Sequence, residues 1–227
     1  MTDLLVEPNA PGAGRWAIAC DATLQAVVDC AECPELFRGT LTRWLSWQAR
    51  NRTTVERVLT TPSLALQWFA GLLALGAVVT VEGQGEVPAE AFLERRVKGR
   101  LVVLHVPVDG ICWGEAHVGR TPADEPIVSA IAAVEPALER SEGLEHGIVR
   151  QARVALTGVW SRPVALAQAP ARLAGSPLTA DGIREVAAAV QSEVTPKGDF
   201  LGSEEYRRAM AGVMARRALE ACLAGGR

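Results

Sequence analysis

The sequence is poor in lysine and carries no excess of positive charge. Only Lys98 and Lys197 among its 23 basic residues are lysines, and the net charge is −3. Nucleic-acid binding requires clustered positive charge to neutralise phosphates, so this balance excludes a dedicated nucleic-acid binder. On a terminal helix, clustered arginines form a solvated face or ion pairs between subunits, and this is the expectation for the densest basic group, Arg207, Arg208, Arg216 and Arg217.

The sequence motifs of the common catalytic and metal-binding sites are also missing. The three histidines lie far apart, and there is no Gly-x-Ser-x-Gly turn, no Walker loop and no Gly-x-Gly-x-x-Gly loop. Cys30 and Cys33 are the one cysteine pair at ligand spacing, and without a second pair or a nearby histidine they cannot complete a tetrahedral site. The sequence therefore predicts no catalytic residues and no metal ligands.

Disulfide bonds are not expected either. Five cysteines are an odd number, and no secretory signal precedes them. Because disulfide frameworks belong to oxidising compartments, these features predict a cytoplasmic protein.

One long run of residues carries no charge. Leu64 to Val81 spans eighteen such residues, which reaches the lower limit for a membrane-spanning helix. However, Gln67 lies inside the run, and Gly76 separates a part rich in Leu and Ala from a β-branched end. The run therefore predicts a buried helix followed by a buried strand, and no membrane span.

The remaining patterns predict a mixture of helices and strands. The expected strands are residues 16–19, 78–81, 102–106, 127–134 and 149–156. The expected helices are residues 23–28, opened by Thr23, and then 36–47, 62–74 and 179–193. Residues 1–14 are expected to be a loose leader, residues 83–85 a hairpin turn, residues 110–119 a linker and residues 142–147 a turn between strands.

The C-terminal region carries the most specific pattern. Ser203 is placed to cap a helix whose first turn holds Glu204 and Glu205, where the helix dipole favours negative charge. Apolar residues then recur at spacings of three and four and predict a core-facing stripe, namely Met210, Val213, Met214, Ala218 and Cys222. The string D-x-x-G-S-x-E-Y-R-R, from Asp199 to Arg208, followed by R-R-A-L, resembles the C-terminal domain of the flavoprotein (medium) subunit of molybdenum hydroxylases, the xanthine dehydrogenase and aerobic carbon monoxide dehydrogenase family.

The resemblance extends over nearly the whole chain. Residues 146–163 are similar to a strand pair of the family with its Arg-x-Ala-x-x-Gly-x-x-x-x-Pro signature, and residues 72–79 and 87–92 resemble the core of its flavin domain. The resemblance implies an α+β fold in two parts. Residues 1–110 would form a truncated PCMH-type FAD-binding domain. Residues 111–227 would form a CO-dehydrogenase-flavoprotein C-terminal-like domain, an antiparallel sheet covered by helices.

The flavin-binding elements of the family are altered here. Family members hold the flavin diphosphate on backbone N–H groups of an Ala-Gly-Gly-Thr loop in an N-terminal subdomain, which we expect this chain to lack. The second phosphate loop of the family reads Arg-Asn-x-Ala-Thr-Ile/Leu-Gly-Gly-Asn. Residues 50–55 keep its first part, whereas Glu56, Arg57 and Val58 replace Gly-Gly-Asn. The Pro-x-x-Asp that follows in the family keeps Pro62 and has Gln67, or a neighbour, in place of the aspartate.

These changes weigh against flavin binding. A carboxylate about 4 Å from a phosphate charge costs about 4 kcal/mol at an effective dielectric of about 20, which Arg57 offsets only if it points inward. The resemblance assigns a degenerate FAD site to Arg50, Asn51, Thr53, Thr54 and His117. We expect this chain alone not to bind FAD. The altered region contains three tryptophans, Trp44, Trp47 and Trp68. We expect their side chains to lie in the core. The alternative is that they fill the space that a flavin would occupy.

Two functional interpretations follow from the resemblance. A third, unrelated interpretation is that the chain is a truncated gene product. In the first, the chain is the medium subunit of an oxidoreductase complex in which electrons pass from molybdenum and iron-sulfur centres towards FAD. In the second, it is a flavin-free structural or assembly subunit of such a complex. The implied partners are a large molybdopterin subunit, which selects the substrate, and a small 2Fe-2S subunit, or a second copy of the chain in a homodimer.

Overall fold

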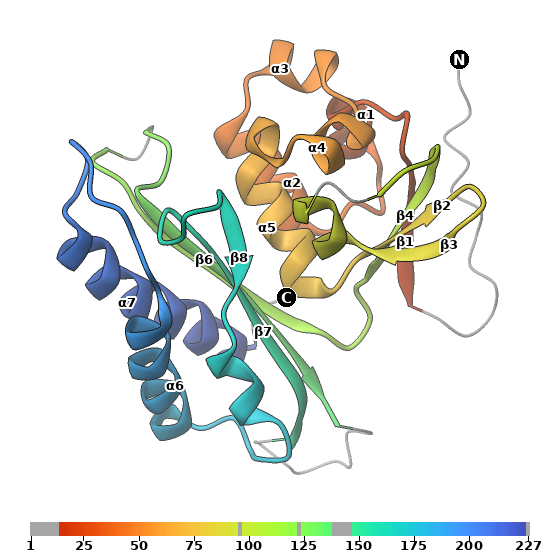
Figure 1. Cartoon of the computed structure of the whole chain (residues 1–227). Helices are drawn as coiled ribbons and strands as arrows, with labels where there is room; N and C mark the ends of the chain where they lie inside the picture. Colours follow the sequence, from red (N-terminus) through yellow and green to blue (C-terminus); the bar gives the residue numbers. More distant parts are fainter. Residues whose placement is uncertain (1–13, 95–96, 122–123, 138–146, 226–227) are drawn as a thin grey trace. The chain divides into compact units, whose positions relative to one another are not determined.

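A computed structural model of the chain describes residues 14–94, 97–121, 124–137 and 147–225. The chain forms two compact units, Met1–Asp109 and Gly110–Arg227, each containing one antiparallel sheet and its own helices (Figure 1). The expected leader, residues 1–14, lies outside the described residues except for Gly14, and the expected turn at residues 142–147 does so except for Gly147.

The first unit contains a four-stranded sheet with the strand order β1-β4-β2-β3. Its strands are β1 (Arg15–Ala19), β2 (Val78–Val81), β3 (Gly85–Pro88) and β4 (Leu101–Pro107). The expected turn at residues 83–85 is confirmed, because β2 and β3 pair antiparallel across it and both Gly83 and Gly85 have positive φ angles, 77° and 80°. One face of the sheet is buried, through Trp16, Ile18, Val79, Val81, Leu104 and Val106.

The charge-free run forms a buried helix and a strand, as predicted. After a 3-10 turn, η1 (Pro62–Ala65), helix α5 (Leu66–Leu75) is buried from Gln67 to Leu75. Gly76 ends it in the left-handed region, at a φ of 72°, where glycine carries no steric penalty. Among the described residues, none of the helices combines the length and the apolar character needed to cross a bilayer.

Among the described residues four further α-helices precede α5, and their boundaries differ from the prediction. The Thr23 hydroxyl caps α1 (Leu24–Asp29), as expected. The single helix expected at 36–47 is two helices, α2 (Glu35–Trp44) and α3 (Trp47–Arg52), because Leu45 is extended and the Ser46 hydroxyl caps the second one. Neither α4 (Val55–Thr60) nor η2 (Ala89–Glu94) was predicted.

The second unit contains a sheet with the strand order β5-β6-β7-β8. Its strands are β5 (Cys112–Val118), β6 (Val128–Pro136), β7 (Val149–Thr157) and β8 (Val164–Leu166). The prediction of a linker at residues 110–119 is wrong, because every residue of β5 pairs with β6. Gly114 lies within β5, where it allows close packing: a Cβ at this position would lie 2.2 Å from the carbonyl oxygen of Ala218 on the covering helix.

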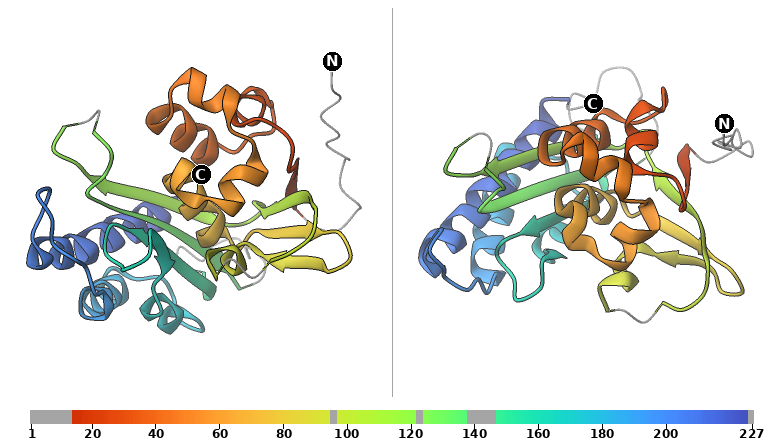
Figure 2. Two further views of the ribbon diagram at one scale, coloured as in Figure 1. Left: turned by 45° about the horizontal axis from the view of Figure 1, so that its top comes forward. Right: turned by 90° about the horizontal axis from the view of Figure 1, so that it is seen from above.

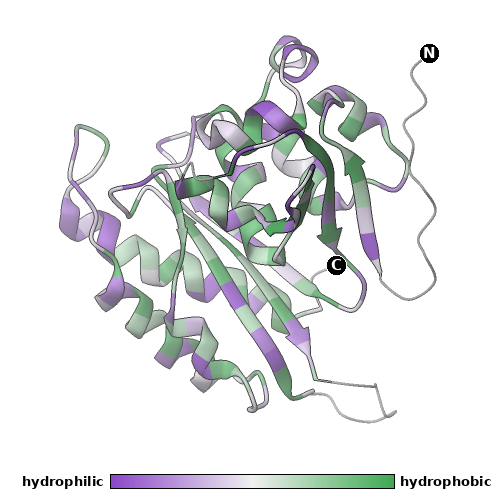
Figure 3. Ribbon diagram, turned by 45° about the vertical axis from the view of Figure 1, so that its right-hand side comes forward, coloured by the Kyte–Doolittle hydropathy of each residue, from purple (hydrophilic) through white to green (hydrophobic). Residues whose placement is uncertain are grey.

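Two helices cover one face of this sheet. These are α6 (Ala180–Glu193), capped by the Thr179 hydroxyl as expected, and α7 (Glu204–Leu223), and both views in Figure 2 show them on the same side. A 3-10 helix, η3 (Ala169–Leu173), follows β8. Each of the long C-terminal helices carries both hydrophobic and hydrophilic residues (Figure 3). The predicted stripe packs against the sheet, with Met214, Ala218 and Cys222 buried and Met210 and Val213 partly buried.

Candidate functional site

The segment that resembles the family's second phosphate loop is the junction of two short helices in the first unit. Helix α3 ends at Arg52, Thr53 follows as its C-cap, and Thr54 caps the start of α4. Both threonines are extended, and Thr54 forms an antiparallel bridge with Thr23. The Leu24 N–H donates a 2.8 Å hydrogen bond to the Thr53 carbonyl. The junction is thereby tied to the start of α1.

The first backbone N–H groups of α4 donate hydrogen bonds to carbonyl groups of the same unit. The N–H of Val55 donates to the Ala22 carbonyl at 3.0 Å, and the N–H of Glu56 donates to the Cys20 carbonyl at 2.8 Å. In a phosphate-binding nest these groups would have to point at the anion. Here each of them already has a carbonyl acceptor.

The next two N–H groups are used by the helix cap. Arg57 donates its N–H to the Thr54 hydroxyl at 3.3 Å, and Val58 donates to the Thr54 carbonyl at 3.2 Å. Four consecutive N–H groups, from Val55 to Val58, are thus satisfied within the first unit. A side chain that caps a helix in this way takes the place that an anion would occupy.

The two polar residues of α3 among the predicted site residues also bond within the first unit. The Arg50 guanidinium donates to the Gln25 amide oxygen at 2.9 Å and to the carbonyls of Leu41 and Leu45. The Asn51 amide donates to the Trp47 carbonyl at 2.8 Å. Both side chains therefore stabilise the local helices.

The five predicted site residues are divided between the two units. Arg50, Asn51, Thr53 and Thr54 follow one another along α3 and into α4, whereas His117 belongs to the second unit, on β5 directly opposite Ser129 of β6.

The residues that replace the family glycines lie at the surface. The side chains of Glu56 and Arg57 are both exposed, and Arg57 donates to the Arg52 carbonyl at 3.3 Å. The Arg57 guanidinium therefore bonds to the end of α3.

Burial, together with the charge of the nearby Glu56, raises the pKa of the Cys20 thiol to about 12, so this thiol stays protonated at neutral pH.

The three tryptophans of this region have different environments. Trp68 is in the core, where its ring meets Phe37 edge-on at 6.1 Å between centroids. Trp44 is half-buried, with the Arg43 guanidinium 6.0 Å from its ring centroid. The expectation of a core position is wrong for Trp47, whose surface is 62% exposed because it opens the first turn of a helix without buried residues.

The cysteines are all free thiols. Cys30 donates to the Glu32 carboxylate at 3.0 Å, and burial raises the pKa of Cys33 to about 12. Within the part of the chain that the structure describes, no three His, Cys, Asp or Glu side chains gather as a metal site would require.

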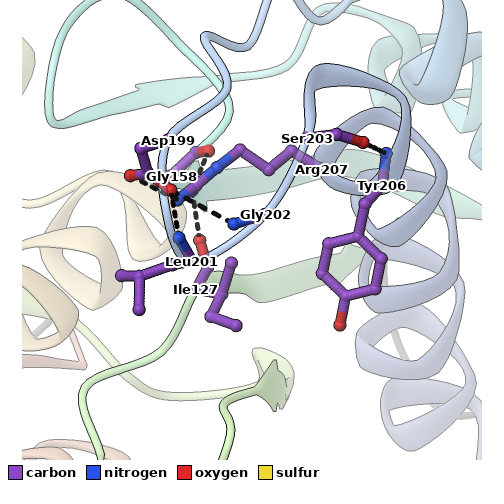
Figure 4. A network of polar contacts seen from close by, with 8 residues as sticks. All are labelled: Ile127, Gly158, Asp199, Leu201, Gly202, Ser203, Tyr206 and Arg207. Atoms are coloured by element: carbon purple, nitrogen blue, oxygen red, sulfur yellow. Dashed lines mark hydrogen bonds and ion pairs between the residues drawn. The ribbon is translucent and has the colours of Figure 1, made fainter.

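A second polar arrangement involves the C-terminal motif in the second unit (Figure 4). The Arg207 guanidinium forms two 2.8 Å hydrogen bonds to the Asp199 carboxylate and two more of the same length to the carbonyls of Ile127 and Gly158. The expectation of a solvated face is therefore wrong for Arg207, which is 6% exposed. Its bidentate bond is the main cause that lowers the pKa of Asp199.

The same contacts explain why glycine stands at position 158 of the upstream signature. Gly158 has a φ of 74°, and a Cβ there would lie 2.0 Å from the Ile127 carbonyl oxygen. Asp199 also accepts the N–H groups of Leu201 and Gly202, and Ser203 caps α7. The two motifs that carried the resemblance therefore meet at one structural centre. Sequence reasoning missed this contact, because Arg207 and Ile127 are 80 residues apart.

Comparisons with known proteins agree with this architecture. Residues 122–222 match the CO dehydrogenase flavoprotein C-terminal domain. The glyceraldehyde dehydrogenase medium chain of Sulfolobus acidocaldarius is 26% identical over 183 residues, which cover 76% of this chain and 62% of that protein. The chain thus spans less than two thirds of this relative's length.

Three solved structures share the fold. CO dehydrogenase from Oligotropha carboxidovorans is 22% identical, with a TM-score of 0.73 over 94% of this chain and 77% of that chain. Quinoline 2-oxidoreductase from Pseudomonas putida 86 is 19% identical, with a TM-score of 0.74 over 95% and 77%. CO dehydrogenase from Hydrogenophaga pseudoflava is 23% identical, with a TM-score of 0.75 over 96% and 78%. Residues 122–222 are therefore a CO dehydrogenase flavoprotein C-terminal domain, and the chain as a whole is similar to a glyceraldehyde dehydrogenase medium chain and shares the fold of these CO dehydrogenase and quinoline 2-oxidoreductase chains.

Proposed function

We propose that this protein is a flavin-free medium-subunit homologue that serves as a structural or assembly subunit of a molybdenum hydroxylase complex. Its partners would be a large molybdopterin subunit and a small 2Fe-2S subunit, or a second copy of the chain. The relationship to a glyceraldehyde dehydrogenase medium chain supports this context. The five free cysteines favour a reducing compartment, and we place the protein in the cytoplasm.

The observation that carries the flavin-free part is the state of the α4 N-terminus. The N–H groups of Val55 and Glu56 donate to Ala22 and Cys20, and those of Arg57 and Val58 donate to Thr54. A flavin diphosphate would have to displace these hydrogen bonds, and each buried carbonyl left without a donor costs about 1–3 kcal/mol. The residues present therefore do not fit an FAD phosphate site.

A flavin-bearing electron-transfer subunit is the second candidate. It is favoured by the retained Arg50, Asn51 and Thr54, which match the first part of the family's phosphate loop. In that case a further polypeptide would have to supply backbone donors for the diphosphate, since the α4 N–H groups already have acceptors.

An absorbance spectrum of the purified chain separates the two candidates. We expect no flavin band at about 450 nm, either as purified or after FAD is added and excess is removed. Stoichiometric FAD that survives gel filtration would overturn the flavin-free assignment. Co-purification from the organism that encodes the protein tests the partners, and a lone monomer free of hydroxylase subunits contradicts that part.

A further inference from the structure

The turn between α1 and α2 carries two cysteines. Cys30 is the C-cap of α1, and Cys33 directly precedes Pro34, the N-cap of α2. The Cys33 N–H donates a 3.2 Å hydrogen bond to the Cys30 carbonyl and closes the turn. The Cα atoms at the two ends of such a turn lie less than about 7 Å apart, and a disulfide bond joins Cα atoms about 4.4–6.8 Å apart. The backbone therefore already has the spacing that a disulfide bond between these residues needs.

The guanidinium of Arg38, on α2, holds this turn in place. It donates to the Cys30 carbonyl at 2.8 Å, to the Cys33 carbonyl at 3.5 Å and to the Val28 carbonyl. Hydrogen bonds from a charged donor are about twice as strong as neutral ones, so the backbone of the turn stays fixed while its side chains react.

The two thiols differ in their access to solvent. Cys33 is 6% exposed, whereas Cys30 is half-buried and its thiol donates a 3.0 Å hydrogen bond to the exposed Glu32 carboxylate. A reagent from solvent therefore reaches Cys30 first. Burial, and then the hydrogen bond to Glu32, raises the pKa of Cys30, so this thiol reacts slowly at neutral pH and faster as the pH rises.

A buried donor lies beside the Cys30 sulfur. Trp16 is 6% exposed, and its indole nitrogen finds no hydrogen-bond acceptor among the described residues. The same indole is one of the lesser causes that lower the pKa of Cys30, against the larger effect of burial, which places its N–H near this thiol. Because a buried donor without an acceptor is costly, a negative charge on the Cys30 sulfur would give the indole the partner that it lacks.

A metal ion fits this pair less well. Two thiols supply half of the ligands of a tetrahedral site. Within residues 14–94 and the other described ranges, no three His, Cys, Asp or Glu side chains gather as a metal would require. Chemistry between the two sulfurs remains.

We propose that Cys30 and Cys33 form a thiol–disulfide exchange site that is oxidised by small organic disulfides. The Cys30 thiolate attacks one sulfur of the small disulfide, whose S–S bond breaks and releases one small thiolate. The Cys33 thiolate then attacks the Cys30 sulfur of this mixed disulfide and displaces the second small thiolate. The chain loses two electrons and two protons, and the small disulfide becomes two thiols. This inference is independent of the proposed function.

Oxidation of the full chain with glutathione disulfide tests the site. After acid quenching and alkylation, the protein is cleaved on the carboxyl side of glutamate. Glu32 lies between the two cysteines, so the peptides on its two sides stay joined only through a disulfide between Cys30 and Cys33. We expect this joined pair in the mass spectrum, and we expect the denatured protein to lose two of its five thiols.

Variants of the two cysteines separate the two steps. Cys33→Ser should stop the reaction after the first step and accumulate glutathione on Cys30. Cys30→Ser should leave Cys33 unmodified, because that thiol is buried. Cys112→Ser, in the second unit, is the matched control and should leave the rate of disulfide formation unchanged.

Trp16→Phe keeps an aromatic ring and removes the N–H. We expect it to slow alkylation of Cys30 about tenfold at pH 8 and to move the pH profile of this reaction to higher pH, as the loss of one hydrogen bond to a charged group would. A purely structural role of Trp16 would leave that profile in place, and this result would remove the indole from the site.

Three outcomes would overturn the exchange site itself. They are a mixed disulfide that persists on Cys30 of the wild-type chain, a disulfide that joins either residue to another cysteine or to a second chain, and a thiol content unchanged by the oxidant. The first would show that Cys33 does not reach the Cys30 sulfur.

Discussion

The Arg207 guanidinium donates a 2.8 Å hydrogen bond to the carbonyl of Gly158, and this contact joins the two motifs of the C-terminal domain. The same side chain reaches Asp199 in the loop before α7 and Ile127 just before β6. One buried charge thus fixes the loop, the start of one strand and the end of another. The motifs are best explained as the structural centre of this fold.

Arg207→Ala should destabilise the second unit. It leaves the carbonyls of Ile127 and Gly158 without their donor and Asp199 without its ion pair, so we expect a loss of about 2–4 kcal/mol in the free energy of unfolding. Urea denaturation measures it. Arg184→Ala, which removes an exposed arginine paired with Asp181, is the control and should change stability by no more than about 0.5 kcal/mol. Equal effects of the two substitutions would contradict the role of Arg207.

The ion pair also predicts a pH dependence. Hydrogen bonding to Arg207 lowers the pKa of Asp199 below its usual value of 3.8. The folded state therefore binds this proton more weakly than the unfolded state, and the stabilisation is present above pH 3.8 and lost as the pH falls through the lower, folded pKa. Asp199→Asn should remove this part of the acid dependence, as followed by the unfolding midpoint between neutral and acidic pH. An unchanged profile would rule out the contribution.

Gly114→Ala tests the correction at β5. The added Cβ would lie 2.2 Å from the Ala218 carbonyl and 2.7 Å from the Ala221 side chain, so helix and strand must separate. We expect a loss of about 1–3 kcal/mol, as in other overpacked cores. Gly39→Ala is a matched control, because no atom lies within 4 Å of its added Cβ on α2. This change should be neutral or stabilising by up to about 1 kcal/mol. If Gly114→Ala is neutral in thermal melts, the packing explanation fails.

Leu72→Asp tests the burial of the charge-free run. Leu72 is fully buried in α5, and an unpaired buried carboxylate costs several kcal/mol against a total stability of about 5–15 kcal/mol. We expect the first unit to lose its cooperative unfolding transition, whereas Leu72→Met should cost less than about 1.5 kcal/mol. Partition of the wild-type protein into membranes would contradict the assignment of α5 as a core helix.

Local signals in the sequence were enough for several elements. Gly76 marks the boundary between α5 and β2, and the capping hydroxyls of Thr23, Thr179 and Ser203 mark helix starts. These features depend on neighbours a few residues away, which a pattern can reveal.

Other features depend on contacts between distant residues. The strand β5 was missed because its pairing with β6 and the contact of Gly114 with α7 join residues that are distant in the sequence. The break between α2 and α3 was missed because apolar residues continue through Leu45. The likeness of residues 50–55 to the family's phosphate loop stays a prediction, and the acceptors of Val55 and Glu56 could not be predicted, since they lie over thirty residues earlier in the chain.

Glycine at positions 56 and 57 should not confer flavin binding on this chain. In the double variant E56G and R57G, both side chains are gone, but the N–H groups of residues 55 and 56 still donate to Ala22 and Cys20. We expect no quenching of FAD fluorescence on titration, together with a loss of about 1–2 kcal/mol in stability, because glycine weakens α4 by about 1 kcal/mol per position. The control is the double variant E56A and R57A, which keeps a Cβ at both positions. It should also take up no FAD, and it should lose less stability than the glycine variant. Tight FAD binding by the glycine variant alone would mean that the side chains, and not the hydrogen bonds of the backbone, exclude the flavin.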